Sequence, residues 1–144
     1  MILTVISLLI IMQPWIADWT FDKQDVAKIL SFHGLELKNS FKILENESGG
    51  LRDYYETFAL KISDSDYSRI AQEIRASKNF KGVFADYKNR PSASAIKYDT
   101  VEFEMGNVLT REYFSNKKMD NGTFHFFIQL DKKAKQLNYT GSDE

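Results

Sequence analysis

The hydrophobic pattern changes its period once within residues 54–80, and this change constrains the fold more than any other feature. Every second residue from 58 to 62 is large and apolar, which is the pattern of a strand with one buried face. In the next segment, apolar residues recur instead at helical spacing: Tyr67, Ile70, Ala71 and Ile74. The stretch therefore predicts a strand that leads directly into an amphipathic helix.

The residues at this junction have the types that begin a helix. Ser63 is a suitable N-cap, and Asp66 stands three residues later, where a capping box places an acidic or amide side chain. Ile62 and Tyr67 stand at the positions of a hydrophobic staple, which fixes the angle between a helix and the preceding chain. We expect the helix to begin directly after Ser63.

The same signals recur near residue 21 and predict an earlier helix. Asp22 is the expected N-cap with Asp25 three positions later, and Gly34 is the expected residue just past the C-terminal end. His33 closes the apolar face of this helix. We therefore expect a core histidine there rather than a ligand or a catalytic base.

The rest of the chain has the pattern of strands joined by tight turns. Residues 35–62 predict a hairpin with its turn at 48–50. Residues 100–130 predict a meander with a turn at 120–122, and residues 137–139 predict a short edge strand. The expected fold is α+β, a two-layer domain whose antiparallel sheet carries two helices on one face, in the order α-β-β-α-β-β-β.

Length and composition agree with one folded domain. The chain has 144 residues, of which 43% are hydrophobic and 14% aromatic, enough to fill one core. The net charge is −1, so the composition gives no indication of nucleic-acid binding. The absence of cysteine excludes disulfides, thiol catalysis and cysteine-based zinc sites.

The N-terminus carries a candidate targeting segment. Residues 2–12 are all apolar or small, and a helix of that length reaches about 16 Å, roughly half of a hydrocarbon core. This length fits the hydrophobic region of a signal peptide, although no basic residue precedes it. A buried first element of the domain is the alternative. We expect residues 1–17 to be a signal or anchor segment, residues 18–144 to be a single domain, and the protein to be exported or membrane-tethered on the envelope side.

One basic segment contrasts with the overall charge. Six basic residues and a single acidic one lie between residues 75 and 97, and the loop around Pro91 is longer than a simple connector. A solvated loop is the simpler interpretation, and contact with an acidic partner or anionic headgroups is the functional one. We expect Lys88 and Arg90 to be exposed charges whose removal costs little stability.

A second candidate surface follows the turn at 48–50, where adjacent tyrosines offer contact area. The two surfaces predict a protein partner or an anionic membrane rather than a reaction centre. The candidate contact residues are Phe84, Tyr87, Lys88, Arg90, Arg52, Tyr54 and Tyr55.

The sequence contains no recognisable catalytic or cofactor motif. The glycine-rich signatures of nucleotide binding, the nucleophile elbow and the metalloprotease motif are all missing. Only His33 and His125 are histidines, and Asp64 begins no calcium loop because the required glycine and glutamate are absent. Glu102 and Glu104 share a strand face, but we expect solvent-facing side chains rather than a catalytic pair. We expect neither a metal nor a cofactor.

The sequence therefore favours a non-catalytic domain with a binding or structural role at the cell envelope. One alternative is an immunity-type protein that neutralises a toxin partner, an analogy of size and class alone. The other is an enzyme or small-ligand carrier with a cleft between helices and sheet, which a pocket with convergent polar groups would favour.

Overall fold

The computed structural model of the protein describes residues 21–50, 54–86, 88–93, 100–115 and 124–143. The predicted signal or anchor segment, the predicted turn at 120–122 and two candidate contact residues, Arg52 and Tyr87, lie outside these ranges. In chain order the elements are α2 (Lys23–Phe32), β1 (Lys42–Gly49), β2 (Tyr54–Lys61), α3 (Asp64–Ala76), β3 (Phe80–Phe84), β4 (Thr100–Met105), β5 (Val108–Ser115), β6 (Phe124–Asp131) and β7 (Gln136–Asp143).

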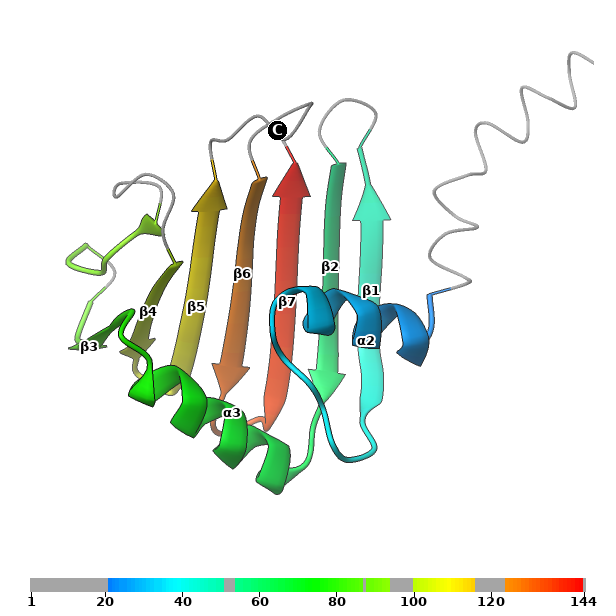
Figure 1. The fold of residues 1–144 in the computed structure, drawn as a ribbon, viewed down its shortest axis with the longest axis horizontal. Coiled ribbons are helices and arrows are strands. Elements are labelled where there is room, and N and C mark those ends of the chain that lie inside the picture. Colours follow the sequence, from blue (N-terminus) through cyan, green and yellow to red (C-terminus); the bar gives the residue numbers. More distant parts are fainter. Residues whose placement is uncertain (1–20, 51–53, 87, 94–99, 116–123, 144) are drawn as a thin grey trace, which may run out of the picture.

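Seven strands form one sheet in the order β1-β2-β7-β6-β5-β4-β3 (Figure 1). All neighbours are antiparallel except β3, which lies parallel to β4. The predicted α+β class and element order are confirmed, with β3 as an added strand and β7 longer than the short strand expected at 137–139. Residues 137–139 belong to β7, so the prediction of a strand there is confirmed, whereas its predicted place at the edge of the sheet is wrong. β7 is a central strand because it pairs with β2 on one side and β6 on the other.

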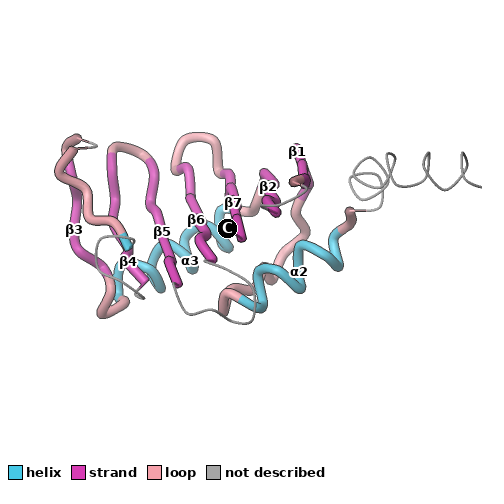
Figure 2. Tube along the Cα trace, turned by 90° about the horizontal axis from the view of Figure 1, so that it is seen from above, coloured by secondary structure: helices cyan, strands magenta, loops and turns pink. Residues whose placement is uncertain are grey.

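Both helices lie on the same side of the sheet (Figures 1 and 2). They share one hydrophobic core with side chains from that face. Val26 and Leu30 of α2 and Ile70 and Ile74 of α3 are buried in it. Facing them are alternate residues of β2, β5, β6 and β7: Phe58, Leu60, Leu109, Phe126, Ile128, Leu130, Leu137 and Tyr139. The period-2 and period-3.6 patterns of the sequence thus meet in this core.

Both helix starts are capped as the sequence predicts. The Asp22 side chain accepts backbone N–H groups of the first turn, and the Asp25 carboxylate accepts the Asp22 N–H at 3.0 Å, which completes a capping box. At α3, Ser63 Oγ accepts the Asp66 N–H at 3.0 Å. After α2 the chain turns at Gly34, whose φ of +70° is a left-handed conformation that favours glycine.

The Asp66 carboxylate accepts the Ser63 hydroxyl at 3.1 Å and also binds a second segment of the chain. It is 1% exposed, accepts the backbone N–H groups of Lys38 at 3.0 Å and Asn39 at 2.9 Å, and pairs with Arg69 at 3.0 Å. Burial alone would raise the pKa of Asp66, but these hydrogen bonds outweigh burial and hold the pKa well below its ordinary value. Asp66 therefore fastens the segment between α2 and β1 to the start of α3.

Candidate binding groove

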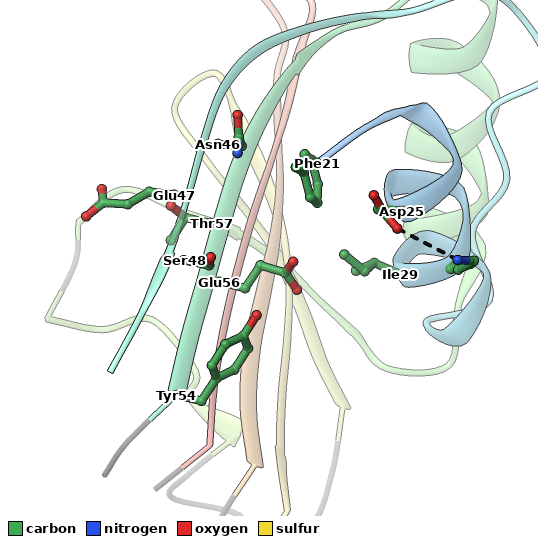
Figure 3. A pocket seen from close by; sticks show the side chains of 10 residues that line it. Phe21, Asp25, Ile29, Asn46, Glu47, Ser48, Tyr54, Glu56 and Thr57 are labelled. Atoms are coloured by element: carbon green, nitrogen blue, oxygen red, sulfur yellow. Dashed lines mark ion pairs between the residues drawn. The ribbon is translucent and has the colours of Figure 1, made fainter. Parts of the chain in front are cut away.

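A groove of about 350 Å³ lies between α2 and the strands β1 and β2 (Figure 3). The carboxylates of Asp25 and Glu56 face it, whereas the side chain of Glu47 points to the other face of β1 (Figure 3). The lining residues are Phe21, Asp25, Lys28, Ile29, Asn46, Glu47, Ser48, Tyr54, Glu56 and Thr57. The groove therefore combines apolar surface with an excess of negative charge.

The helical period of α2 supplies one wall. Val26 and Leu30 point into the core, and Asp25 and Ile29, one residue earlier in each turn, point into the groove (Figure 3). The ring of Phe21 packs against a phenylalanine of β2 with ring centroids 5.6 Å apart. This contact holds the start of α2 against the sheet, so the groove has a fixed helix wall.

The strand period of β2 supplies the other wall. Tyr54 and Glu56 stand on the same face as the buried Phe58, so both side chains extend toward α2 (Figure 3). Tyr54 is 51% exposed. Tyr55 points to the opposite face, where its hydroxyl donates to Glu47 Oε1 at 2.7 Å. The structure thus places Tyr54 in the groove and Tyr55 on the opposite face of the sheet.

Glu56 carries the perturbed charge of the groove. Burial raises the pKa of its carboxyl group, and the negative charge of Asp25 raises it further. Asp25 already has partners, since it accepts the Asp22 N–H and lies 3.7 Å from Lys28 Nζ. Within the described part of the chain, the Glu56 carboxylate makes no hydrogen bond or ion pair. The sequence contained a signal for this site, because Glu56 interrupts the apolar face of a predicted strand.

These features suit a cationic group on an aliphatic stem. The carboxylates attract an ammonium or guanidinium group, and Phe21 and Ile29 offer apolar contact to the methylene groups behind it. A metal centre has no comparable support, since no set of three acidic or histidine residues within the described ranges is arranged to hold a metal ion.

A larger hollow of about 590 Å³ runs along α2 and the segment after it, and its polar lining residues are Lys28, Ser31 and Glu36. Its lining is mainly apolar and includes Val26, Ala27, Leu30, Leu35, Leu37 and Phe41. We take the smaller groove as the candidate site because Glu56, a carboxylate without an ion pair among the described residues, faces it.

Arg90 lies in a buried ion pair and not on an exposed loop. Its Nη1 is 3.3 Å from Glu112 Oε2, and the two side chains are 16% and 1% exposed. Ser92 Oγ donates to Glu112 Oε1 at 3.0 Å, and His125 Nε2 lies 3.1 Å from the same oxygen. The prediction that Arg90 is an exposed charge is wrong, because Glu112 of β5 draws the loop onto the sheet face opposite the helices.

The other residues of the predicted basic surface have different surroundings. Phe84 packs edge-on against Phe103, with centroids 6.3 Å apart, in a small second core on that opposite face. Lys88 is exposed, as are Lys78 and Lys81. The structure therefore leaves these three lysines, together with Arg75, which pairs with Glu104, as the exposed basic part of this segment in the described ranges.

Glu102 and Glu104 do not face solvent, contrary to the sequence prediction. Glu102 is 1% exposed, and its Oε1 accepts the Arg111 Nε–H at 2.6 Å, while its Oε2 is buried without a hydrogen bond to any described residue. Glu104 pairs with Arg75 of α3 at 2.9 Å. Both face the helix layer, which the alternating pattern alone did not reveal, because their arginine partners come from β5 and α3.

His33 is the core histidine that the sequence predicts. Its Nε2 lies 3.2 Å from the Tyr139 hydroxyl, and its ring centroid lies 3.8 Å from that of Phe126. Burial lowers the pKa of His33 to about 4, and the positive charge of Arg111 contributes to the shift. His33 is therefore neutral at pH 7.

No protein-family model, curated protein or solved structure matches this chain. Within the described ranges, neither helix combines the length and apolar character that crossing a membrane requires. The functional interpretation therefore rests on the geometry and charge of the groove.

Proposed function

We propose that the protein is a small, non-catalytic binding domain that captures a cationic side chain of a protein partner in the groove between α2 and β2. The observation that carries this proposal is Glu56, a half-buried carboxylate that faces the groove and makes no ion pair with a described residue, since Lys28 of the same groove pairs with Asp25. A charge removed from water without a partner costs free energy, and a bound ammonium or guanidinium group would remove part of that cost.

The proposed setting is the exported or membrane-tethered side of the cell envelope. Its support is the apolar segment 2–12, whose length fits a signal peptide. An immunity-type protein would need the same kind of surface, so the groove serves that alternative as well. A small-ligand carrier would instead hold a free amine in the groove.

A second candidate partner is an anionic membrane surface, supported by the exposed Lys78, Lys81 and Lys88. These lysines lie in or next to β3, the sheet edge opposite β1. Basic residues beside an anionic bilayer contribute about 1 kcal/mol each. Binding to phosphatidylserine vesicles that is lost when all three become glutamine would support this partner, and unchanged binding would contradict it.

The groove is tested with N-acetyl-lysine methylamide, titrated into isotope-labelled protein and followed by NMR. We expect the shifted signals to belong to α2, β1 and β2. Glu56→Gln should weaken binding about tenfold or more, because a hydrogen bond to a charged group contributes about 1.5–3 kcal/mol. Affinity should also fall as the pH drops below the raised pKa of Glu56, since protonation removes the charge.

Two controls isolate the charge in the groove. The norleucine analogue has the same stem without the ammonium group and should not bind detectably. Glu45→Gln makes the same change of net charge on the exposed opposite face of β1 and should leave the affinity unchanged. Equal affinity of the wild type and Glu56→Gln for the lysine analogue would contradict the proposal.

A further inference from the structure

β1 forms one edge of the sheet and borders the groove. It pairs with β2 along one side, and no strand of the described ranges pairs with its other side. Such an edge presents N–H and C=O groups that can pair with an added strand. A bulge between Ile43 and Glu45 interrupts the start of β1, whereas residues 45–49 pair with β2 in regular register. The regular part of the edge is therefore the part that lines the groove.

Negative charge lies on both faces of this edge. Asn46 and Ser48 of β1 stand on the α2 side, next to the groove that contains Glu56. Glu45 and Glu47 stand on the opposite side, because successive residues of a strand point to opposite faces. A strand added to β1 would therefore meet carboxylates on both of its faces.

The position beside β1 also lies under a helix. Figures 1 and 2 both show α2 extending past β1 beyond the edge of the sheet. Neighbouring strands are about 4.8 Å apart, so a strand added to β1 would lie about 10 Å from β2. A long basic side chain on its α2 side, together with the side chain of Glu56, spans this separation.

We propose that the partner delivers its cation on an extended segment that adds to β1 as an eighth strand and carries two consecutive basic residues. One basic side chain enters the groove toward Glu56, and the next points to the other face, toward Glu45 and Glu47. This inference rests on the proposed function and adds the conformation and sequence of the partner.

The charges of Glu45 and Glu47 favour a basic extended segment over a second copy of the chain as the partner of β1. Pairing of β1 with β1 would bring Glu45 and Glu47 of two copies side by side, and like charges on neighbouring strands are destabilising. A basic segment gains from the same carboxylates. The surface therefore fits a basic extended segment of another protein.

The test uses the full chain and a capped eight-residue peptide of alternating valine and threonine with a central lysine pair. Two further peptides carry backbone N-methyl groups on alternate residues, one on the odd and one on the even positions. In an added strand only one of these sets points its N–H groups toward β1. We expect one methylated peptide to bind like the parent and the other to bind about tenfold more weakly or worse, measured by fluorescence anisotropy.

Equal affinity of the two methylated peptides, whether both bind or neither does, would overturn strand addition. Replacement of both lysines by glutamine should weaken the parent peptide about tenfold or more, and replacement of either one alone should weaken it by less. A dimer of the chain that dissociates on peptide addition would show that β1 pairs with itself, and it would overturn the charge argument against a second copy.

The outcome separates this inference from the proposed function. If the lysine analogue binds in the groove but the methylated peptides do not differ, the groove captures a cation without strand addition. If neither the analogue nor the parent peptide binds, both proposals fail. Amide signals of residues 45–49 that become protected from hydrogen exchange only with the parent peptide would support the added strand directly.

Discussion

The two ends of the sheet use the same residue type in opposite ways. At the end formed by β4 and β5, three glutamates each bind an arginine, at 2.6, 2.9 and 3.3 Å: Glu102 with Arg111, Glu104 with Arg75, and Glu112 with Arg90. At the end formed by β1 and β2, Glu56 is half-buried and binds no cation within the described ranges.

The paired glutamates of β4 and β5 hold the fold together, whereas Glu56 of β2 does not. Arg75 belongs to α3 and Arg90 to the loop after β3, so their ion pairs fasten these elements to the sheet. Glu56 fastens no element, and its raised pKa shows that the ionised carboxylate is disfavoured where it stands. An ionisable group held in an unfavourable position beside a groove is typical of a binding site.

Arg90→Ala should cause the largest loss of stability among the charge changes at either end. Among the described residues, removing Arg90 leaves the buried Glu112 carboxylate with Ser92 and His125 as partners. We therefore expect a loss of roughly 3 kcal/mol, the lower end of the range for broken buried pairs. Urea unfolding monitored by circular dichroism measures the change in the free energy of unfolding.

The matched control is Lys88→Ala, two residues away in the same loop. Lys88 is exposed, so its removal should change stability by no more than about 0.5 kcal/mol. Similar losses for the two variants would show that the Arg90–Glu112 pair does not fasten the loop, and the contrast between the two ends of the sheet would disappear.

Asp66→Asn should have an intermediate effect. The change weakens the hydrogen bonds from Lys38, Asn39 and Arg69, so we expect a loss of about 1.5–3 kcal/mol at pH 7. The folded-state pKa of Asp66 lies below its ordinary value of 3.8. Its contribution is therefore present above that value and is lost as the pH falls below it toward the folded-state pKa.

Unfolding curves of the wild type and the variant between pH 7 and pH 2 test this contribution. The difference between them should shrink only below about pH 4. Protonation of His33, whose pKa is lowered to about 4, also destabilises the folded protein in acid. Because His33 is present in both the wild type and the variant, it does not affect the difference between their unfolding free energies. A difference that stays constant down to pH 2 would show that the charge of Asp66 is not what holds the segment.

Local signals in the sequence predicted the elements well, and nonlocal contacts decided what it missed. The caps at Asp22 and Ser63 and the turn at Gly34 each depend on residues within one turn of helix, and all three are present. The central place of β7 depends on pairing with β2, more than 70 residues earlier, and no local pattern encodes it. The burial of Arg90 likewise depends on Glu112, which lies on another strand.

The sequence predicted only one wall of the candidate groove, for the same reason. Tyr54 was a predicted contact residue, and the strand period places Glu56 beside it on the inward face. Nothing local indicates that Asp25, in the first turn of a helix, lies across from Glu56. Only the packing of Phe21 and α2 on β2 brings the two carboxylates to one groove.

Glu56→Gln should have a smaller effect on stability than Arg90→Ala or Asp66→Asn, and the opposite sign. The folded-state pKa of Glu56 is raised above its ordinary value of 4.5, so the folded protein holds this proton more tightly than the unfolded chain does. The wild type should therefore lose stability as the pH rises from about 4.5 through the folded-state pKa, whereas the variant lacks this loss. Because the carboxyl group is half exposed, the gain in stability of the variant at pH 8 should stay within about 1 kcal/mol.

Urea unfolding at pH 4 and pH 8, with Glu45→Gln as the exposed control, measures this gain. If Glu56→Gln destabilises the protein at pH 8, its carboxylate holds the fold as Glu112 does, and the two ends of the sheet do not differ.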